Sequence, residues 1–190
     1  GVAITESWQL VEVDRESEPG RLEALRSRVL SALHDVRRVT SDWLPMRRAS
    51  AAIAESLRSD PPVPAAEARE AATLLEWMAD NHFTFLGYRE YRLRRGRSHD
   101  VLEPLAKTGL GLMRPEAGRP VAPPTRLSGD IREFARSRDL LIITKANSIA
   151  TVHRATHLDY VGVKTFDARG RISGERRFIG LWTSTAYSSS

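Results

Sequence analysis

The sequence predicts an α+β fold built on an antiparallel sheet, and two observations carry that prediction. Residues 140–185 contain three β-prone runs, LLIITKA, HLDYVGVKTFD and ERRFIGLWTST, which short polar breaks separate. A further strand pattern, HFTFLGYREYRLRRG, begins at His82, and a polar segment with a short helical pattern lies between it and the three runs. A strand region, a helical excursion and three consecutive strands are typical of the α+β class.

The composition fits a globular protein without cysteine chemistry. The chain has 190 residues, 41% of them apolar, and no run approaches the roughly 18 apolar residues of a membrane span. The absence of cysteine excludes disulfides, thiolate nucleophiles and Cys-ligated zinc, and is typical of a cytoplasmic protein. The net charge is +5, but arginine and glutamate are interspersed, which indicates a solvated surface. We expect no signal peptide, and a start inside an alternating pattern is typical of a fragment.

The first 60 residues predict one strand followed by helices. Residues 6–13, ESWQLVEV, alternate like a strand, and we interpret residues 1–18 as the end of an upstream domain. Over residues 21–43 the apolar side chains recur every three or four positions, which predicts an amphipathic helix. Pro45 has no N–H group, so we expect it to end or kink this helix, with a second helix over residues 46–58.

A proline-rich segment predicts a boundary between a helical connector, residues 19–60, and the following domain. Three prolines fall within residues 61–64 and favour an extended linker. A third helix is expected over residues 65–80, with the Asp80-Asn81 pair as its C-terminal cap. Residues 65–190 are then expected to form one α+β domain.

The strand pattern that begins at Phe83 alternates with a period of two. VLEPL is consistent with a return strand, residues 107–124 with a loop, and residues 128–138 with a short helix whose Ile131 and Phe134 face inward. The alternation predicts one strand face with Phe83, Phe85, Gly87, Tyr91 and Leu93, and another with Thr84, Tyr88, Glu90 and Arg92.

The last three runs are the clearest part of the expected sheet. Residues 140–146 have the composition of a buried strand, and Asp167 to Gly170 predict a hairpin turn. Strands, a helical crossover and a three-strand meander follow in the order of a PAS-like sheet. The middle run is expected to place Leu158, Tyr160, Gly162, Lys164 and Phe166 on one face, and Asp159, Val161, Val163 and Thr165 on the other.

Motifs for catalysis or metal binding are weak. His153 and His157 are spaced as HxxxH, but this spacing brings two imidazoles together only on a helix, and the surroundings are β-prone. No GxSxG motif supports a Ser-His-Asp triad. The run GLGLMR at residues 109–114 lacks the third glycine and the strand–turn–helix context of a dinucleotide site. We therefore expect no catalytic residue, metal or cofactor here.

Arginines with interleaved tyrosines end the strand pattern of residues 83–97. Basic and aromatic side chains on a sheet are one signature of RNA binding. A charged, solvated edge that prevents strand-to-strand aggregation is the interpretation that we favour. The residues concerned are Arg89, Arg92, Arg94, Arg95 and Arg97, with Tyr88 and Tyr91.

Polar residues in otherwise apolar strands are the most informative set. A charge inside a strand must face water, pair with an opposite charge or hold a ligand. Pairing of Lys164 with Asp159 or Glu175 is the structural interpretation, which we favour, and a carboxylate held by an arginine is the functional one. Arg176 and Arg177 are expected on opposite faces of the last strand. The candidate ligand-binding residues are Lys145, Asn147, Arg154, Lys164, Arg176 and Arg177, from a set that also contains His153 and Asp159.

Three stretches resemble one known family. Residues 140–187, NHFTFLGYREY at residues 81–91 and KTGLGLMR at residues 107–114 closely resemble the N-terminal regulatory region of the large, multidomain NAD-specific glutamate dehydrogenases of bacteria. ESWQLVEVDR with the helix after it looks like the end of that family's first ACT-type domain. The resemblance covers essentially the whole chain, and several motifs in the same order make it specific.

The resemblance implies a parent enzyme that converts L-glutamate, NAD and water to 2-oxoglutarate, ammonia and NADH. It also implies that the catalytic domain, with its NAD, lies C-terminal to this segment, and that ACT- and PAS-type modules here serve regulation and assembly of a homo-oligomer. The expected partners are other domains of the same polypeptide, without a membrane. A sensor for an amino acid or carboxylate is the alternative function, and a basic nucleic-acid-binding domain is less favoured.

Overall fold

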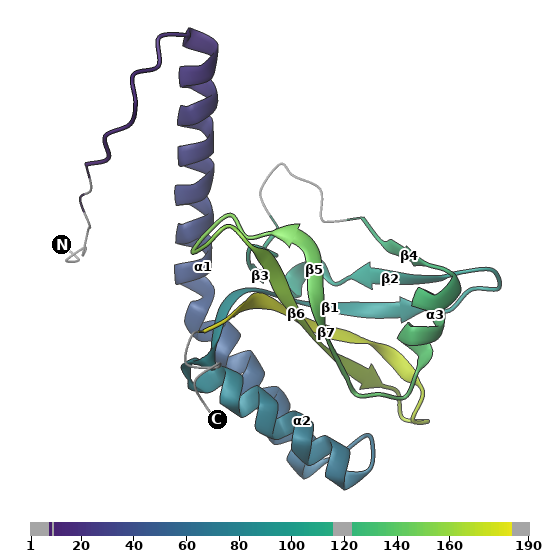
Figure 1. Ribbon diagram of the computed structural model, residues 1–190. Helices are drawn as coiled ribbons and strands as arrows, with labels where there is room; N and C mark the ends of the chain where they lie inside the picture. Colours follow the sequence, from purple (N-terminus) through teal and green to yellow (C-terminus); the bar gives the residue numbers. More distant parts are fainter. Residues whose placement is uncertain (1–7, 9, 116–122, 184–190) are drawn as a thin grey trace.

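The computed structural model describes residues 8, 10–115 and 123–183, and it combines helices with one antiparallel sheet (Figure 1). The sheet has seven strands, so the predicted α+β class is confirmed. One long helix projects from the body, and its second half packs beside a second helix against one face of the sheet. Along the described stretches, no helix has an apolar run long enough to cross a bilayer.

The N-terminal stretch forms no strand where it is described. The predicted strand at residues 6–13 lies partly outside the described residues, and residues 10–13 have no regular secondary structure. Trp8 and Leu10 are 90% and 91% exposed. A single strand needs a neighbour for its backbone hydrogen bonds, and no described strand lies beside this one.

Helix α1, Pro19–Ser59, is continuous, so the predicted division into two helices is wrong. Pro45 lies inside it, and Figure 1 shows the helix changing direction between its first and second halves, so of the two effects expected of this proline the helix shows a kink and no end. Buried side chains on both sides of the proline, Asp42 and Met46, anchor the helix to the body. Tertiary packing therefore maintains the helix across a residue that removes one of its hydrogen bonds.

Helix α2, Ala65–Trp77, returns along the second half of α1 after the linker of residues 61–64. The Ser50 hydroxyl donates a hydrogen bond to the Leu75 carbonyl at 2.9 Å across this helix pair. The wider turn η1, Met78–His82, ends the helix with Asn81 at φ 64°, in the left-handed region that a C-terminal cap requires. The predicted end of this helix is therefore confirmed.

The strands follow in the order that the sequence predicts, with a hairpin region first and a meander last. All neighbours are antiparallel, and the order across the sheet is β4-β2-β1-β7-β6-β5, with β3 also pairing with β1. The elements are β1 Phe83–Arg94, β2 Asp100–Pro104, η2 Ala106–Thr108, β3 Leu110–Gly111, β4 Thr125–Leu127, α3 Gly129–Arg136, β5 Leu141–Ile149, β6 His157–Phe166 and β7 Ile172–Trp182.

A β-bulge at Leu86 decides which β1 side chains share a face. Phe85 pairs with Gly180, and Gly87 pairs with Ile179, which is the neighbour of Gly180 on β7. Leu86 therefore has no partner on β7 and is an extra residue in β1. The side chains after the bulge therefore lie on the opposite face from that expected. Tyr88 joins Phe85 in the core, and the prediction that Phe85 shares a face with Tyr91 is wrong.

The core lies between one sheet face, here called the core face, and the two long helices. Phe178 and Val161 from the sheet are fully buried in one cluster with Met46 of α1 and Leu75 of α2. The second half of α1 thus shares a core with the sheet, while the division into a connector and a domain stays a prediction. The opposite face is here called the pocket face.

For the three-strand meander, the sequence predicts the hairpin at one end correctly and the burial of the strand at the other end wrongly. Gly170 has φ 68°, and its N–H donates to the Asp167 carbonyl at 2.9 Å, so the predicted hairpin is confirmed. Strand β5 is an edge strand, with Ile143 54% exposed, so the expected buried strand is wrong. Apolar composition alone does not distinguish a central strand from an edge strand that has one unpaired side.

Candidate functional site

A pocket of about 500 Å³ lies on the pocket face, between the sheet and α3. Its lining is mainly apolar, with Ile131 and Phe134 from α3 and Ile142 and Ile179 from the sheet. Ile131 and Phe134 remain 64% and 49% exposed, although their helix lies over the pocket. The expected inward orientation of these side chains is met, but they face an open cavity instead of packed core.

Arg177 of β7 contributes a guanidinium to the lining of this pocket. Its Cζ atom lies 4.0 Å from the ring centroid of Tyr91 on β1 and 4.8 Å from that of Tyr160 on β6. Because β7 runs between β1 and β6, the rings flank the guanidinium from two sides. The Nε atom donates to Glu175 at 3.1 Å. Among the described residues, the Tyr160 hydroxyl is the one further hydrogen-bond partner near this guanidinium.

Glu175 joins Arg177 and Tyr160 into one network. Its Oε1 atom accepts hydrogen bonds from the Tyr160 hydroxyl and the Arg177 Nε atom. Burial, followed by the Glu175 charge, raises the pKa of Tyr160, so the hydroxyl stays protonated. Burial lowers the pKa of Arg177, but Glu175, Tyr160 and Tyr91 together more than offset this, and the pKa lies above its ordinary value. A Cβ at Gly162 would lie 2.8 Å from Glu175 Oε1, so glycine makes room for the carboxylate.

Lys164 holds α3 over the pocket. Its Nζ atom donates to the Phe134 and Ser137 carbonyls at 2.9 and 2.7 Å, and to the Ser137 hydroxyl at 2.9 Å. These carbonyls end α3, where a cation is favoured by the helix dipole. Burial lowers the pKa of Lys164, while nearby carboxylates, Asp139 first, oppose that shift. All three ammonium protons have acceptors, so Lys164 is a tether for the helix.

The favoured pairing of Lys164 with Asp159 or Glu175 is therefore not what the structure shows. Glu175 lies opposite Lys164 in the strand register, but its carboxylate bonds to Tyr160 and Arg177. Asp159 lies on the core face and pairs with Lys145 at 2.6 Å. The acceptors of Lys164 come from α3, which alternation within the strand cannot reveal.

Asp100 forms the second tether of α3. Its side chain is fully buried and accepts hydrogen bonds from Arg136 Nε at 2.6 Å, Arg132 Nε at 3.3 Å and the Gly96 N–H at 3.1 Å. The Arg136 hydrogen bond is the main cause that lowers the pKa of Asp100 to about 2. The carboxylate therefore fixes both arginines of α3 to the start of β2.

Arg89 is buried on the pocket face, directly opposite Arg177 in the strand register. Its terminal nitrogen donates to the Met113 carbonyl, and its Nε atom has no partner. Among the described residues it forms no ion pair. The expected solvated arginine edge is therefore wrong at Arg89, because β1 is a central strand. Farther along the strand Arg94 pairs with Glu103 at 2.6 Å.

The remaining predicted ligand residues do not converge. Lys145 and Asn147 of β5 border the pocket, but the Lys145 ammonium pairs with Asp159 on the core face. Arg154 donates to the Trp182 carbonyl at 3.2 Å. Arg176 lies 4.0 Å from Glu90 on the opposite face from Arg177, so the predicted separation of the two arginines is confirmed. The structure brings together only Lys164 and Arg177, with Lys145 and Asn147 nearby.

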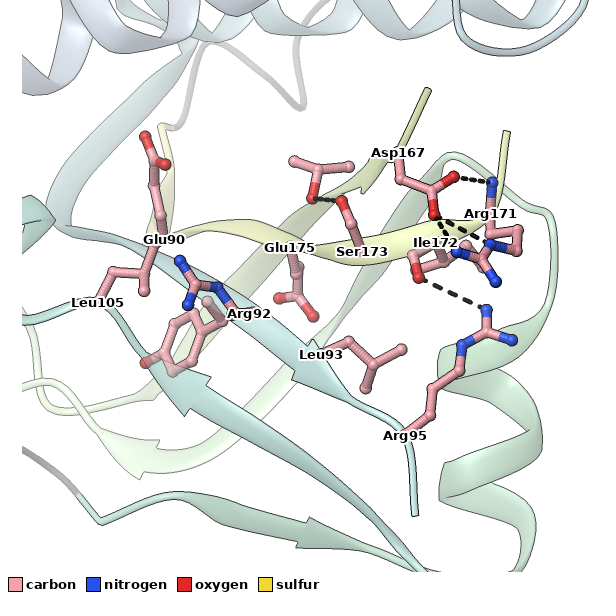
Figure 2. A pocket seen from close by; sticks show the side chains of 12 residues that line it. Glu90, Arg92, Leu93, Arg95, Leu105, Asp167, Arg171, Ile172, Ser173 and Glu175 are labelled. Carbon is pink, nitrogen blue, oxygen red and sulfur yellow. Dashed lines mark hydrogen bonds and ion pairs between the residues drawn. The ribbon is translucent and has the colours of Figure 1, made fainter. Parts of the chain in front are cut away.

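A second hollow, of about 420 Å³, lies near the turn between β6 and β7 (Figure 2). Figure 2 shows Arg171 against Asp167 at one end, and Glu90 at the other. Arg171 pairs with Asp167 at 2.8 Å, and Arg95 donates to the Ile172 carbonyl at 3.4 Å. The charged groups at the turn are thus used within the protein.

The glycine-rich run at residues 109–114 has a structural role. Gly111, at φ 57°, pairs with Gly87 of β1, and its N–H donates to the buried Asp42 carboxylate at 2.8 Å. A Cβ on Gly111 would lie 2.3 Å from the Leu86 carbonyl oxygen. The predicted loop 107–124 thus contains the end of η2 and all of β3, while its residues 116–122 lie outside the described residues. The glycine-rich run connects α1 to β1.

The histidine pair is divided between a loop and a strand. His153 lies in the loop after β5, with φ 74°, and His157 begins β6, where its Nδ1 atom lies 3.1 Å from the Ala146 carbonyl oxygen. Within the described part of the chain, no three His, Cys, Asp or Glu side chains gather as a metal site would require.

The fold and the pocket define a small α+β module whose buried charges mainly fasten its own elements together. The chain is 35% identical over 190 residues to NAD-specific glutamate dehydrogenase of Halomonas elongata, and 34% identical over 186 residues to the protein of that name from Pseudomonas aeruginosa. Each match covers 97% of this chain but only 12% of the relative's length. No family model matches the chain. The predicted resemblance to NAD-specific glutamate dehydrogenases is confirmed, and the chain is similar to a short segment of these large enzymes.

Tyr160 and Asp100 were not expected as site residues, Glu175 was expected only as a partner of Lys164, and Arg89 only as a member of a basic edge. The alternation of β6 places Tyr160 with Lys164, and the spacing of Glu175 and Arg177 on β7 places these two on one face, so this signal was available. The burial of Arg89 depends on the central position of β1, and the partners of Asp100 come from α3, so neither has a local signal.

Proposed function

We propose that this chain is a non-catalytic regulatory and oligomerisation segment of an NAD-dependent glutamate dehydrogenase of the cytoplasm. The observation that carries the proposal is the match to 12% of each relative's length, which leaves most of such an enzyme for catalysis and NAD binding. The GLGLMR run supports it, because the Gly111 N–H is occupied by Asp42 and is unavailable to a phosphate. The parent reaction is then oxidation of L-glutamate to 2-oxoglutarate, ammonia and NADH.

The proposal assigns the sheet to a PAS-like domain over residues 65–190, after an ACT-like end over residues 1–18 and a helical connector over residues 19–60. A hairpin region, a crossover through α3 and a three-strand meander support the PAS-like assignment. The connector is the part proposed to meet other domains or a second subunit. Apolar side chains along its first half are exposed, including Val29, Leu30, Leu33 and Val36 at 41–52%.

A sensor for a small carboxylate is the second candidate function, and the pocket favours it. An apolar cavity with a few convergent polar groups is the usual form of a small-molecule site. Arg177 supplies a guanidinium with donors left over. The nucleic-acid alternative has less support, because Arg89 is buried and Arg94 pairs with Glu103, which interrupts the basic surface.

Glutamate-dependent formation of NADH tests the non-catalytic role. The isolated chain, given L-glutamate and NAD, is expected to produce no NADH above a protein-free blank, while the full-length enzyme that contains it produces NADH in the same assay. Turnover by the isolated chain that scales with its concentration would overturn the proposal. If the isolated chain forms NADH at the same specific activity after a second purification, a contaminating enzyme is excluded as the source.

A further inference from the structure

The charges on the pocket face do not balance. Lys164 is compensated by the carbonyls that end α3 and, through the Ser137 hydroxyl, by Asp139. Arg177 is compensated by Glu175. Arg89, 4% exposed and adjacent to Arg177 in the register, has no carboxylate partner among the described residues. A buried cation without a counter-charge is unfavourable, so the part of the pocket face around Arg89 and Arg177 favours an anion.

The donors that remain on Arg177 have a geometry suited to a carboxylate. The guanidinium lies over the rings of Tyr91 and Tyr160, and Glu175 occupies its Nε edge. The edge formed by the two terminal nitrogens is the part of the guanidinium that remains for a ligand. A planar guanidinium offers two parallel N–H groups along such an edge, which match the two oxygens of a carboxylate.

The apolar lining of the pocket determines which group a ligand can carry beside its carboxylate. Ile131 and Phe134 of α3 face Ile142 and Ile179 across a cavity of about 500 Å³, which suits a small apolar group. Lys164 has no free proton, so a second anionic group would find no further donor there. An ammonium group beside Arg177 would meet a like charge that Glu175 already balances, and the buried Arg89 adds a second positive charge on the neighbouring strand.

We propose that this pocket binds a small monocarboxylate with a compact apolar body and no ammonium group, and that Arg177 holds the carboxylate. In assigning this ligand as an effector, the inference rests on the regulatory role proposed above. It narrows the sequence-based expectation of an amino acid or carboxylate to one class. The bound carboxylate would contact both the apolar side chains of α3 and strand β7, which carries Arg177.

Isothermal titration calorimetry of the chain with 3-methylbutanoate tests the inference separately from any enzyme assay. Saturable binding is expected, with at least about tenfold weaker binding of valine, which adds an ammonium group at C2, and of 3-methylbutan-1-ol, which lacks the carboxylate. Arg177→Gln is expected to weaken binding at least about tenfold. The matched control Arg176→Gln changes the next residue, on the other face, and should keep the affinity within about twofold.

A second variant keeps the test decisive if Arg177→Gln does not fold. Ile131→Glu alters a side chain that is 64% exposed, and it is expected to fold and to weaken binding at least about tenfold by placing a negative charge in the apolar wall. Absence of 3-methylbutanoate binding at several millimolar would overturn the proposal. So would valine binding as tightly as 3-methylbutanoate, or equal losses in Arg176→Gln and Arg177→Gln. The NADH assay is unaffected by these outcomes, so the two proposals fail separately.

Discussion

Replacement of Phe178 by alanine is expected to lower the free energy of unfolding of the chain by about 3–5 kcal/mol. The Phe178 side chain is fully buried, with its ring centroid 5.6 Å from that of Phe85 and 4.8 Å from that of Tyr88. It lies in the cluster that also contains Met46 of α1 and Leu75 of α2. The cavity would therefore weaken the contact of both helices with the sheet.

Urea unfolding followed by circular dichroism and tryptophan fluorescence measures this effect. Phe134→Ala is the matched control, since Phe134 is 49% exposed, and it should cost less than about 1 kcal/mol. The helical and fluorescence signals are expected to change together in both variants, because the second half of α1 shares the core. A loss below about 1 kcal/mol in Phe178→Ala, or helical unfolding well before the sheet, would contradict a shared core.

Asp100→Asn is expected to destabilise the chain by about 2–3 kcal/mol at pH 7. The substitution removes the only carboxylate that Arg132 and Arg136 share, and it leaves two guanidinium groups against a neutral amide. Breaking a buried pair costs about 3–5 kcal/mol. We expect a smaller effect because Arg136 is 36% exposed and water can solvate it in the variant. Glu133→Gln, on the exposed side of α3, is the control and should change stability by less than about 0.5 kcal/mol.

The same substitution is expected to change the response to acid. The pKa of Asp100 is about 2 in the folded chain and 3.8 without the interactions of the fold. Its contribution to stability is therefore fully present above pH 3.8 and is lost as the pH falls through 2. The stability difference between wild type and Asp100→Asn should be constant from pH 7 to about pH 5 and should narrow below pH 4. A difference that stays constant down to pH 2 would show that Asp100 does not hold α3 as a charged group.

Local patterns in the sequence predicted much of the fold. The period-two alternation of β6 predicted its two faces, and the adjacent arginines 176 and 177 were correctly expected on opposite sides of β7. Asn81 and Gly170 marked a helix end and a hairpin because both need the left-handed backbone region. These features depend on residues close together in the chain.

The wrong predictions all depended on distant contacts. Pro45 does not end α1 because buried residues on both sides anchor the helix, and the bulge at Leu86 exchanges the faces of β1 because the partner strand β7 omits one residue. Strand β5 is apolar but lies at a sheet edge. A local pattern cannot show which strand is central or what packs against a helix.

The candidate site was only partly predictable for the same reason. Lys164 and Arg177 were recognised as unusual charges in strands, but their partners come from α3, β1 and β6. Arg89 looked like one member of a basic run, and only the sheet order shows that it is buried beside Arg177. Two of the segments that resemble glutamate dehydrogenases contain Gly87 and Gly111. These segments lie side by side in the structure, because β1 pairs with β3.

The most direct test of a regulatory role is the initial rate of glutamate-dependent NADH formation by the full-length enzyme, measured against 3-methylbutanoate concentration. The regulatory account predicts a saturable change in rate whose midpoint matches the dissociation constant of the isolated chain. Arg177→Gln in the full-length enzyme should lose this response at those concentrations, whereas Arg176→Gln should retain it. A constant rate across concentrations that saturate the isolated chain would contradict the account, as would an unchanged response in Arg177→Gln, which would place the effect at the active site.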